Sequence, residues 1–274
     1  MLKSQLKKIL NKLPSIVTQP LFYLITEGLQ RPQFSIANTK EKALLSEIWE
    51  HGFTIIENYK DSEFCDTCIQ DFEKGREKFP SFVHHGDDIR LYGLEHFSPT
   101  IHSFFDDPFI YKLANLYTRK KIERVFSLVN KVEKVGEFGS GGGWHRDWFF
   151  HELKALLYLT DVDETKGPFE LLKGSHRLKW IMKDIQTGGL SFNQNRLDKN
   201  INAILKQYPE RHVSLTGKKG TLVIFDMTTI HRGAPLKQDC RYAITMQYSD
   251  KKISEKVDYY QYMAPVLTEK DVNP

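Results

Sequence analysis

Short segments rich in β-forming residues, separated by turn residues, fill the second half of the chain. Such runs are typical of strands. Because they are brief and do not alternate regularly with helices, they favour a sandwich or barrel over a parallel α/β sheet. The segments are RVFSLVNKVEKV (124–135), KALLYLTDV (154–162), HVSLTG (212–217), GTLVIFDM (220–227) and RYAITMQYS (241–249).

Helical patterns precede these strands. Gly52 is a helix stop signal, and Asp61 or Ser62 is a helix cap. We therefore expect a mainly β domain with flanking α-helices over residues 33–274. The elements predicted in its first half are a helix at 40–51, a strand at 53–59, and helices at 61–78 and 106–121.

Residues 1–32 form a separate basic segment. Its first part, MLKSQLKKILNKL (1–13), places leucines and Ile9 on one helical face and lysines on another, and Pro14 ends the pattern. Such a helix can lie on an anionic membrane surface or pack on its own domain. We expect a cytoplasmic protein, peripheral on the inner face of a membrane in the first case. No apolar run reaches the ~18 residues that a membrane span needs.

Composition narrows the class of protein. A formal net charge of +4 is too small for a dedicated nucleic-acid binder. Three cysteines in a chain of this size indicate a reducing compartment rather than a disulfide framework. Cys65 and Cys68 are spaced like a redox or metal pair, but they fall within the predicted helix 61–78 and have no second pair.

The motif that carries chemistry is GSGGGWHRDWFF (139–150). In a strand, residues two apart share a face, so His145 and Asp147 can both reach one point. An imidazole nitrogen and a carboxylate oxygen suit a divalent metal, but two ligands are too few. His231, which follows the strand-like GTLVIFDM, is the best third ligand. Two histidines and one carboxylate form the facial triad of non-haem Fe(II) oxygenases.

Arg241 begins the last predicted strand. If it faces inward, then Ala243, Thr245 and Gln247 share its face, and the bulky residues between them face an outer layer. A guanidinium beside a metal in an apolar barrel calls for a carboxylate partner that it can hold bidentately. A dicarboxylate cosubstrate reaching from the metal to Arg241 meets this need.

The HxD motif at 145–147, the later His231 and Arg241 ten residues beyond it together resemble the Fe(II)/2-oxoglutarate-dependent dioxygenases. The stretch GPFELLKGSHR (167–177) is similar to the Gly-Pro to Gly-Ser-His turn of the phytanoyl-CoA dioxygenase family. The resemblance covers about residues 40–250.

This resemblance implies a double-stranded β-helix, a jelly-roll barrel of cupin-like shape, with flanking helices. It also implies Fe(II), 2-oxoglutarate and O2 as the reactive partners. By the resemblance, His145, Asp147 and His231 hold the iron, and Arg241 binds the distal carboxylate of 2-oxoglutarate.

Some members of the family carry a serine two residues after the distal histidine, where it helps the arginine. Gly233 stands there in this chain, and Thr245 is our candidate for the missing contact. The implied reaction is oxidative decarboxylation of 2-oxoglutarate to succinate and CO2, coupled to hydroxylation of an organic substrate. In halogenating relatives a small residue replaces the carboxylate ligand, so Asp147 disfavours halogenation.

Other histidines are weaker candidates for the metal. A second HxD motif, 85–87, lies among turn-like residues and lacks the strand that should follow it. His176 is expected to tie its turn together, and His151 and His212 to be surface or packing residues. The glycines before His145 permit close approach or movement of the backbone, and the aromatic residues 148–150 shield the site or belong to the core.

The substrate is the least constrained part of the prediction. The basic segment 1–13 and the clusters 119–121 and 218–219 favour an anionic lipid or glycolipid at a membrane surface, such as the acidic sugar of a lipopolysaccharide precursor. A soluble metabolite or an acyl-CoA is the alternative substrate. The alternative functions are a catalytically silent metal-binding jelly roll and a scaffold held at membranes.

Overall fold

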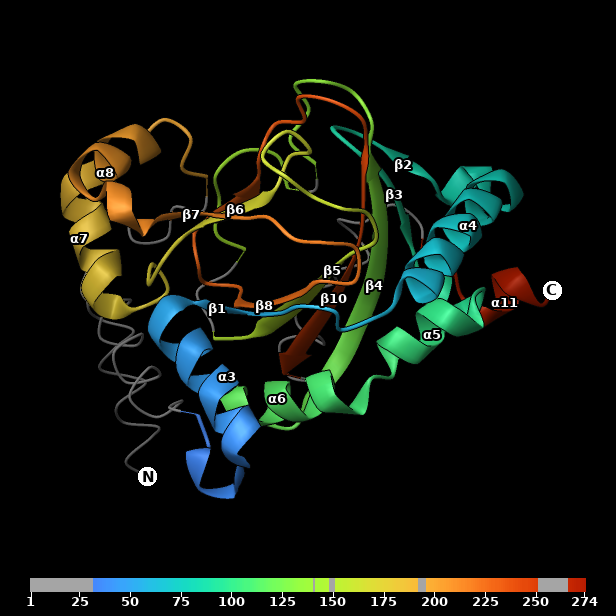
Figure 1. The fold of residues 1–274 in the computed structure, drawn as a ribbon, viewed down its shortest axis with the longest axis horizontal. Helices are drawn as coiled ribbons and strands as arrows, with labels where there is room; N and C mark the ends of the chain where they lie inside the picture. The colour runs from blue at the N-terminus through green and yellow to red at the C-terminus, as the bar shows by residue number, and fades with distance from the viewer. Residues whose placement is uncertain (1–31, 140, 148–150, 192–195, 251–265) are drawn as a thin grey trace, which may run out of the picture.

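The computed structural model describes residues 32–139, 141–147, 151–191, 196–250 and 266–274. Two antiparallel sheets form its centre (Figure 1). The large sheet has the order β1-β8-β5-β10-β4-β3-β2, and the small sheet has the order β7-β6-β9. In chain order the strands are β1 (Phe53–Ile56), β2 (His84–His85), β3 (Ile89–Tyr92), β4 (Ile122–Val132), β5 (Leu153–Tyr158), β6 (Phe169–Leu172), β7 (His212–Leu215), β8 (Leu222–Asp226), β9 (His231–Gly233) and β10 (Arg241–Asp250).

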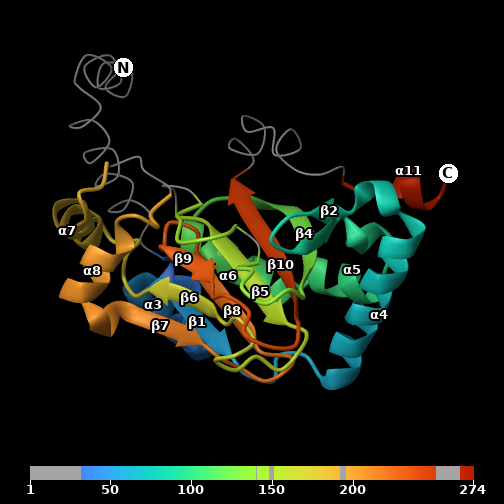
Figure 2. The same ribbon diagram turned by 90° about the horizontal axis from the view of Figure 1, so that it is seen from above.

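The two sheets share a core. Phe169 and Leu171 of β6 and Leu215 of β7 pack with Val223 and Phe225 of β8. This is the jelly-roll arrangement expected from the sequence, mainly β with flanking helices, although hydrogen bonds do not close the described strands into one barrel. In Figure 2 the small sheet lies on the β1 and β8 side of the large sheet, away from β4 and β2.

Helices cover the outer face of the large sheet. They contribute Ile48, Phe72 and Ile110 to the largest core cluster, where these residues meet Leu157 and Ile244 of the sheet. The helices of this layer are α3 (Thr39–His51), α4 (Ser62–Lys78), α5 (Pro99–Phe105) and α6 (Pro108–Thr118). A second pair, α7 (Leu178–Gly188) and α8 (Ile201–Gln207), packs beside the small sheet. The chain ends with α11 (Glu269–Val272), and 3-10 turns lie at Phe34–Ile36, Pro80–Phe82, Leu94–His96 and Pro209–Arg211.

The structure confirms the predicted helix stop at Gly52 and the predicted helix cap at Asp61, whereas the helix predicted at 106–121 is the shorter α6, capped by Asp107. The α3 helix begins after Asn38, which forms a capping box with Glu41, and ends at Gly52. The side chain of Asp61 accepts a hydrogen bond from the Phe64 amide at the start of α4. Cys65 and Cys68 are buried in α4 as free thiols, so they pack in a helix as expected.

The predicted split of β10 into two faces is confirmed for most of its residues. Arg241, Ala243 and Thr245 line a cavity between the sheets. The bulky residues between them, Tyr242, Ile244, Met246 and Tyr248, pack into the core beneath the helices. The period-two pattern therefore places the polar face of β10 toward the site.

The basic segment 1–13, with its predicted membrane contact, lies outside the described residues. Within the described part of the chain, no helix combines the length and the apolar character needed to cross a bilayer.

Candidate active site

The backbone brings the two halves of the predicted metal site together. His145 lies between β4 and β5, and His231 is the first residue of β9. The two residues form an antiparallel bridge, with N···O distances of 3.0 and 2.9 Å in its two hydrogen bonds. Because the bridge sets them opposite each other, their rings lie side by side with centroids 4.3 Å apart. Outside this bridge the HxD segment is not a regular strand, in contrast to the prediction.

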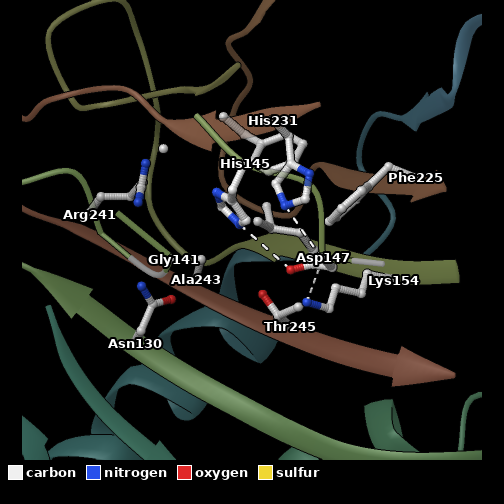
Figure 3. Close-up of a pocket in the computed structure, with 13 residues that line it drawn as sticks. Asn130, Gly141, His145, Asp147, Lys154, Phe225, His231, Arg241, Ala243 and Thr245 are labelled. Carbon is white, nitrogen blue, oxygen red and sulfur yellow. Dashed lines mark hydrogen bonds and ion pairs between the residues drawn. The ribbon is translucent and has the colours of Figure 1, made fainter. Parts of the chain in front are cut away.

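Asp147 completes a group of three ligand atoms. Its Oδ1 lies 3.6 Å from Nε2 of His145, and its Oδ2 lies 3.5 Å from Nε2 of His231 (Figure 3). The three ligand atoms lie within 4.8 Å of one another, and no other such group of three occurs among the described residues. Two imidazoles and one carboxylate are the donor set of a non-haem Fe(II) site, so the residues present fit this metal.

Backbone carbonyls fix which nitrogen of each imidazole faces the site. Nδ1 of His145 donates to the Gly143 carbonyl over 2.8 Å, and Nδ1 of His231 donates to the Thr229 carbonyl over 2.7 Å. A neutral imidazole that donates from Nδ1 has an unprotonated Nε2. Both Nε2 atoms are therefore prepared as metal ligands.

Electrostatics also prepare the ligands. Burial by itself raises the pKa of Asp147, but the Lys154 ammonium, His231 and His145 together outweigh burial and hold that pKa well below its usual range. Burial, assisted by neighbouring His145, lowers the pKa of His231 to about 3. At neutral pH these groups are a carboxylate and a neutral imidazole, the forms that bind a metal.

Lys154 is a site residue that the sequence analysis did not select. Its Nζ lies 2.8 Å from Oδ2 of Asp147. It projects from β5 with Leu156 into the cavity, while Ala155 and Leu157 belong to the core beneath the helices. The sequence did contain a signal for this residue. Lys154 begins the apolar run KALLYL at a position that faces inward, and a charge at such a position needs a partner.

Arg241 lies at the other end of the cavity, on the same strand face as Ala243 (Figure 3). It is 6% exposed, and its Nε atom has no hydrogen-bond partner among the described residues. Burial lowers the pKa of this guanidinium, but an arginine in a protein stays charged. A buried cation with an unpaired donor is costly, so Arg241 fits an anionic partner that the chain itself does not supply.

The glycine at 233 is explained by a close backbone approach. A Cβ atom at this position would lie 2.1 Å from the Phe138 carbonyl oxygen and 3.2 Å from Nη2 of Arg241. The serine found here in some relatives therefore does not fit this backbone. Similarly, a Cβ at Gly141 would lie 2.5 Å from the ring of His145. This close approach explains the glycine at position 141, four residues before His145.

Thr245 lines the cavity but lies away from Arg241. The two residues are four positions apart on β10, with Ala243 between them. In Figure 3 Thr245 lies beside Lys154 and Asp147, at the metal end of the cavity. Nearer Arg241, Asn130 of β4 is opposite Ala243 and donates to Asp88 over 2.7 Å. Thr245 thus remains a proposed cosubstrate contact, placed closer to the metal than expected.

Arg146, between the two ligands of the HxD motif, points away from the cavity. It is 3% exposed, and its Nη1 donates to the carbonyls of Ser175 and Thr228, each over 2.6 Å. Asp184 of α7 lies 3.8 Å from its Nη2 and is held by Arg211 at 2.5 and 3.1 Å. This buried ionic group connects the HxD segment to the Gly-Ser-His turn and to the loop that leads to His231.

The remaining histidines have other partners. His85 is exposed on β2 and is not part of the metal group. His176 is buried and donates from Nε2 to the Trp49 carbonyl over 3.0 Å, which ties its turn to α3 as expected. His151 is a buried packing residue, 2.6 Å from Oδ2 of Asp226. His212 is exposed and pairs with Glu170 at 3.3 Å.

The aromatic residues around the motif fall into two groups. Trp144 is 2% exposed and packs with Leu172 and Leu197 near α8, away from the cavity, so it is a core residue. Residues 148–150, which were expected to shield the site or to join the core, lie outside the described residues. Instead, Phe169 and Phe225 line the cavity, with ring centroids 5.3 and 5.0 Å from that of His231.

Comparison with known proteins agrees with this geometry. Residues 49–241 match the family described as phytanoyl-CoA dioxygenase (PhyH). The chain belongs to the phytanoyl-CoA dioxygenase family. The match spans His145, Asp147 and His231 and ends at Arg241, so it covers these four residues but not Thr245. No protein of curated function matches the chain by sequence.

Solved structures with the same fold include three 2-oxoglutarate enzymes. The α-ketoglutarate-dependent epimerase SnoN from nogalamycin biosynthesis is 15% identical, with a TM-score of 0.57 over 77% of this chain and 83% of its own. EctD from S. alaskensis, solved with bound Fe, is 15% identical, with a TM-score of 0.59 over 78% and 77%. HygX from Streptomyces hygroscopicus, solved with nickel and 2-oxoglutarate, is 14% identical, with a TM-score of 0.57 over 78% and 88%.

Membership of the phytanoyl-CoA dioxygenase family defines the reaction class. The chain is an Fe(II)/2-oxoglutarate-dependent oxygenase, with Fe(II), 2-oxoglutarate and O2 as its cofactors and cosubstrates. The donor set of His145, Asp147 and His231 and the unpaired Nε donor of Arg241 are the features of this structure that fit the metal and the cosubstrate.

Proposed function

We propose that the protein couples oxidative decarboxylation of 2-oxoglutarate to hydroxylation of an organic substrate. One observation carries the proposal: a candidate metal-ligand triad, with both histidines buried, and a buried arginine with an unpaired Nε donor lie at two ends of one cavity. A dicarboxylate that binds the metal at one end satisfies the guanidinium at the other.

Each residue has a defined part in this proposal. His145, Asp147 and His231 hold Fe(II), and Arg241 binds the distal carboxylate of 2-oxoglutarate while Thr245 contacts it nearer the metal. When bound, the metal and cosubstrate supply the oxidising chemistry and yield succinate and CO2. Phe169 and Phe225 limit the access of water to His231. Because Asp147 occupies the carboxylate position, hydroxylation is favoured over halogenation.

The substrate is proposed to be a small organic molecule. The lipid or glycolipid suggested by the sequence depends on residues 1–13 and on two lysine clusters. Lys218 pairs with Asp161 at 2.9 Å and Lys219 pairs with Asp66 at 2.7 Å, so the second cluster is already occupied. This favours a soluble substrate, and the membrane-surface lipid rests on segment 1–13 and on the cluster 119–121.

Oxygen labelling tests the hydroxylation. Metabolite and membrane-lipid extracts are incubated with the Fe(II) protein and 2-oxoglutarate under 18O2, and the products are analysed by mass spectrometry. We expect a product that gains one 18O atom with wild-type protein and not with Arg241→Met. A product that instead loses two hydrogens or gains a halogen would contradict hydroxylation.

Vesicle binding tests the lipid substrate separately. The full chain and a variant lacking residues 2–13 are sedimented with anionic and with neutral vesicles at low and high salt. If the substrate lies in a membrane, we expect salt-sensitive binding to anionic vesicles that the deletion removes. Equal binding by both proteins would exclude this role for the segment.

A further inference from the structure

The active-site cavity has a cation at each end. Arg241 faces it from the first residue of β10, and Lys154 faces it from β5 (Figure 3). Lys154 is paired with Gln247, six residues along β10 from Arg241, which corresponds to about 20 Å of strand. The metal ligands lie between them, next to Lys154. A cosubstrate that reaches from the metal to Arg241 therefore leaves the Lys154 end of the cavity free.

Lys154 has unused hydrogen-bonding capacity. An ammonium carries three donors, and one is directed at Asp147. The hydrogen bonds and ion pairs of the described residues give Lys154 no second acceptor. Glu152, two residues earlier on the chain, accepts from Ser249 over 2.8 Å and does not line the cavity. The side chain of Lys154 is only 16% exposed, so water reaches it poorly.

The charges of the loaded site do not balance without a further anion. The described charged side chains that line the cavity are Asp147, Lys154 and Arg241. When Fe(II) and the 2-oxoglutarate dianion are added to these three side chains, the net charge of the site is +1. The Asp147 carboxylate then also binds the metal, so it neutralises Lys154 less fully. A side-chain cation that is largely shielded from water and lacks an anionic partner of its own is unfavourable. The excess charge lies at Lys154, because 2-oxoglutarate satisfies Arg241.

We infer that the prime substrate carries an anionic group, a carboxylate or a phosphate, and that Lys154 binds it. This inference rests on the proposed function, since it assumes that metal and 2-oxoglutarate occupy the rest of the cavity. A charge-assisted hydrogen bond from Lys154 positions the substrate beside the metal ligands. The substrate class is therefore an organic acid or a phosphate ester rather than a neutral molecule.

Binding of simple anions tests the inference before the substrate is known. Protein is loaded with Ni(II), which does not turn over, and with saturating 2-oxoglutarate so that Arg241 is occupied. Acetate, its neutral counterpart acetamide and inorganic phosphate are then titrated by calorimetry, with the unfolding temperature as a second readout. The variants are Lys154→Met, Lys154→Arg, which keeps the charge, and Lys42→Met, a control at an exposed position of α3.

We expect acetate or phosphate to bind wild-type protein about tenfold more tightly than acetamide. Lys154→Arg and Lys42→Met should keep this preference, and Lys154→Met should lose it. Preference for acetate identifies a carboxylate, and preference for phosphate identifies a phosphate ester. The inference is overturned if wild-type protein prefers neither anion or if the preference survives in Lys154→Met. Absence of 2-oxoglutarate binding to the wild-type Ni(II) protein would overturn the proposed function as well.

Discussion

Nη1 of Arg146 lies 2.6 Å from the carbonyl oxygen of Thr228, three residues before the proposed metal ligand His231. The same atom donates to the Ser175 carbonyl, and Ser175 in turn accepts a hydrogen bond from the Ile230 amide over 2.7 Å. The residue between the first two ligands thus holds the loop that carries the third. We therefore expect Arg146 to be a positioning residue, which would act on a bound metal only through these backbone segments.

Replacing Arg146 should loosen the metal site. We expect Arg146→Met to weaken Co(II) affinity by ~10–100-fold, as other second-sphere substitutions do, and to alter the visible spectrum of bound Co(II). Arg146→Lys, which keeps the charge opposite Asp184, should recover part of the affinity. A merely structural role would lower the unfolding temperature of Arg146→Met while leaving the affinity and spectrum of its folded fraction unchanged.

Arg241 should determine cosubstrate affinity and not metal affinity. Removing one partner of a buried charge pair costs about 2–5 kcal/mol, so Arg241→Met should weaken 2-oxoglutarate binding at least ~30-fold. Arg241→Lys should also bind poorly, because an ammonium cannot form the bidentate pair. Calorimetry of the Ni(II) protein measures the 2-oxoglutarate affinity of both Arg241 variants. The same measurement on Thr245→Ala shows how much Thr245 contributes to cosubstrate binding. Unchanged 2-oxoglutarate affinity in Arg241→Met would exclude the assigned role.

A serine at position 233 should damage the site, although some relatives carry one there. Its Cβ would meet the Phe138 carbonyl at 2.1 Å, and overpacking of this kind costs about 1–3 kcal/mol. Gly233→Ser should therefore lower the unfolding temperature and weaken 2-oxoglutarate binding. Gly86→Ser is the control, because the nearest atom to its Cβ lies 3.5 Å away, in the His84 side chain. Tighter cosubstrate binding by Gly233→Ser would show that this backbone adapts to the serine.

His176 should make stability depend on pH. Burial lowers its pKa from 6.5 to about 3 in the folded protein. Between these values the unfolded chain binds the proton and the folded one does not, so stability falls as pH drops from 6.5 toward 3. Each pKa unit of this difference changes the free energy of unfolding by about 1.4 kcal/mol. In urea unfolding, the pH dependence should be shallower for His176→Gln than for wild type over this window. If the free energy of unfolding depends on pH in the same way in both proteins, His176 is not the titrating group.

The sequence predicted those features that depend on local pattern. Capping by Asp61, the stop at Gly52 and the alternation along β10 follow from short-range geometry, and the structure agrees with each. The donor set of the metal site was also readable, because the residue types and the order of His145, Asp147 and His231 are themselves the signal.

The contacts that support the site were not predictable in this way. The Arg146–Asp184 contact depends on how distant segments pack, and no spacing in the sequence encodes it. For Lys154 the sequence indicates an inward charge that needs a partner, but it does not identify Asp147 as that partner. Thr245 shows the related limit. The period-two pattern correctly predicted that Thr245 faces the cavity. Which part of the cosubstrate it can reach depends on its distances from Arg241 and from the proposed metal ligands, and the pattern does not give these.

Succinate formation tests the central assignment most directly. Oxygen is admitted to anaerobic protein loaded with Fe(II) and 2-oxoglutarate, and succinate is measured for wild type, Asp147→Ala and His85→Ala, the last as a control for the second HxD motif. We predict slow succinate formation by wild type and by His85→Ala, and none by Asp147→Ala. Succinate at the wild-type rate from Asp147→Ala, or none from wild-type protein that has bound both iron and 2-oxoglutarate, would contradict the account.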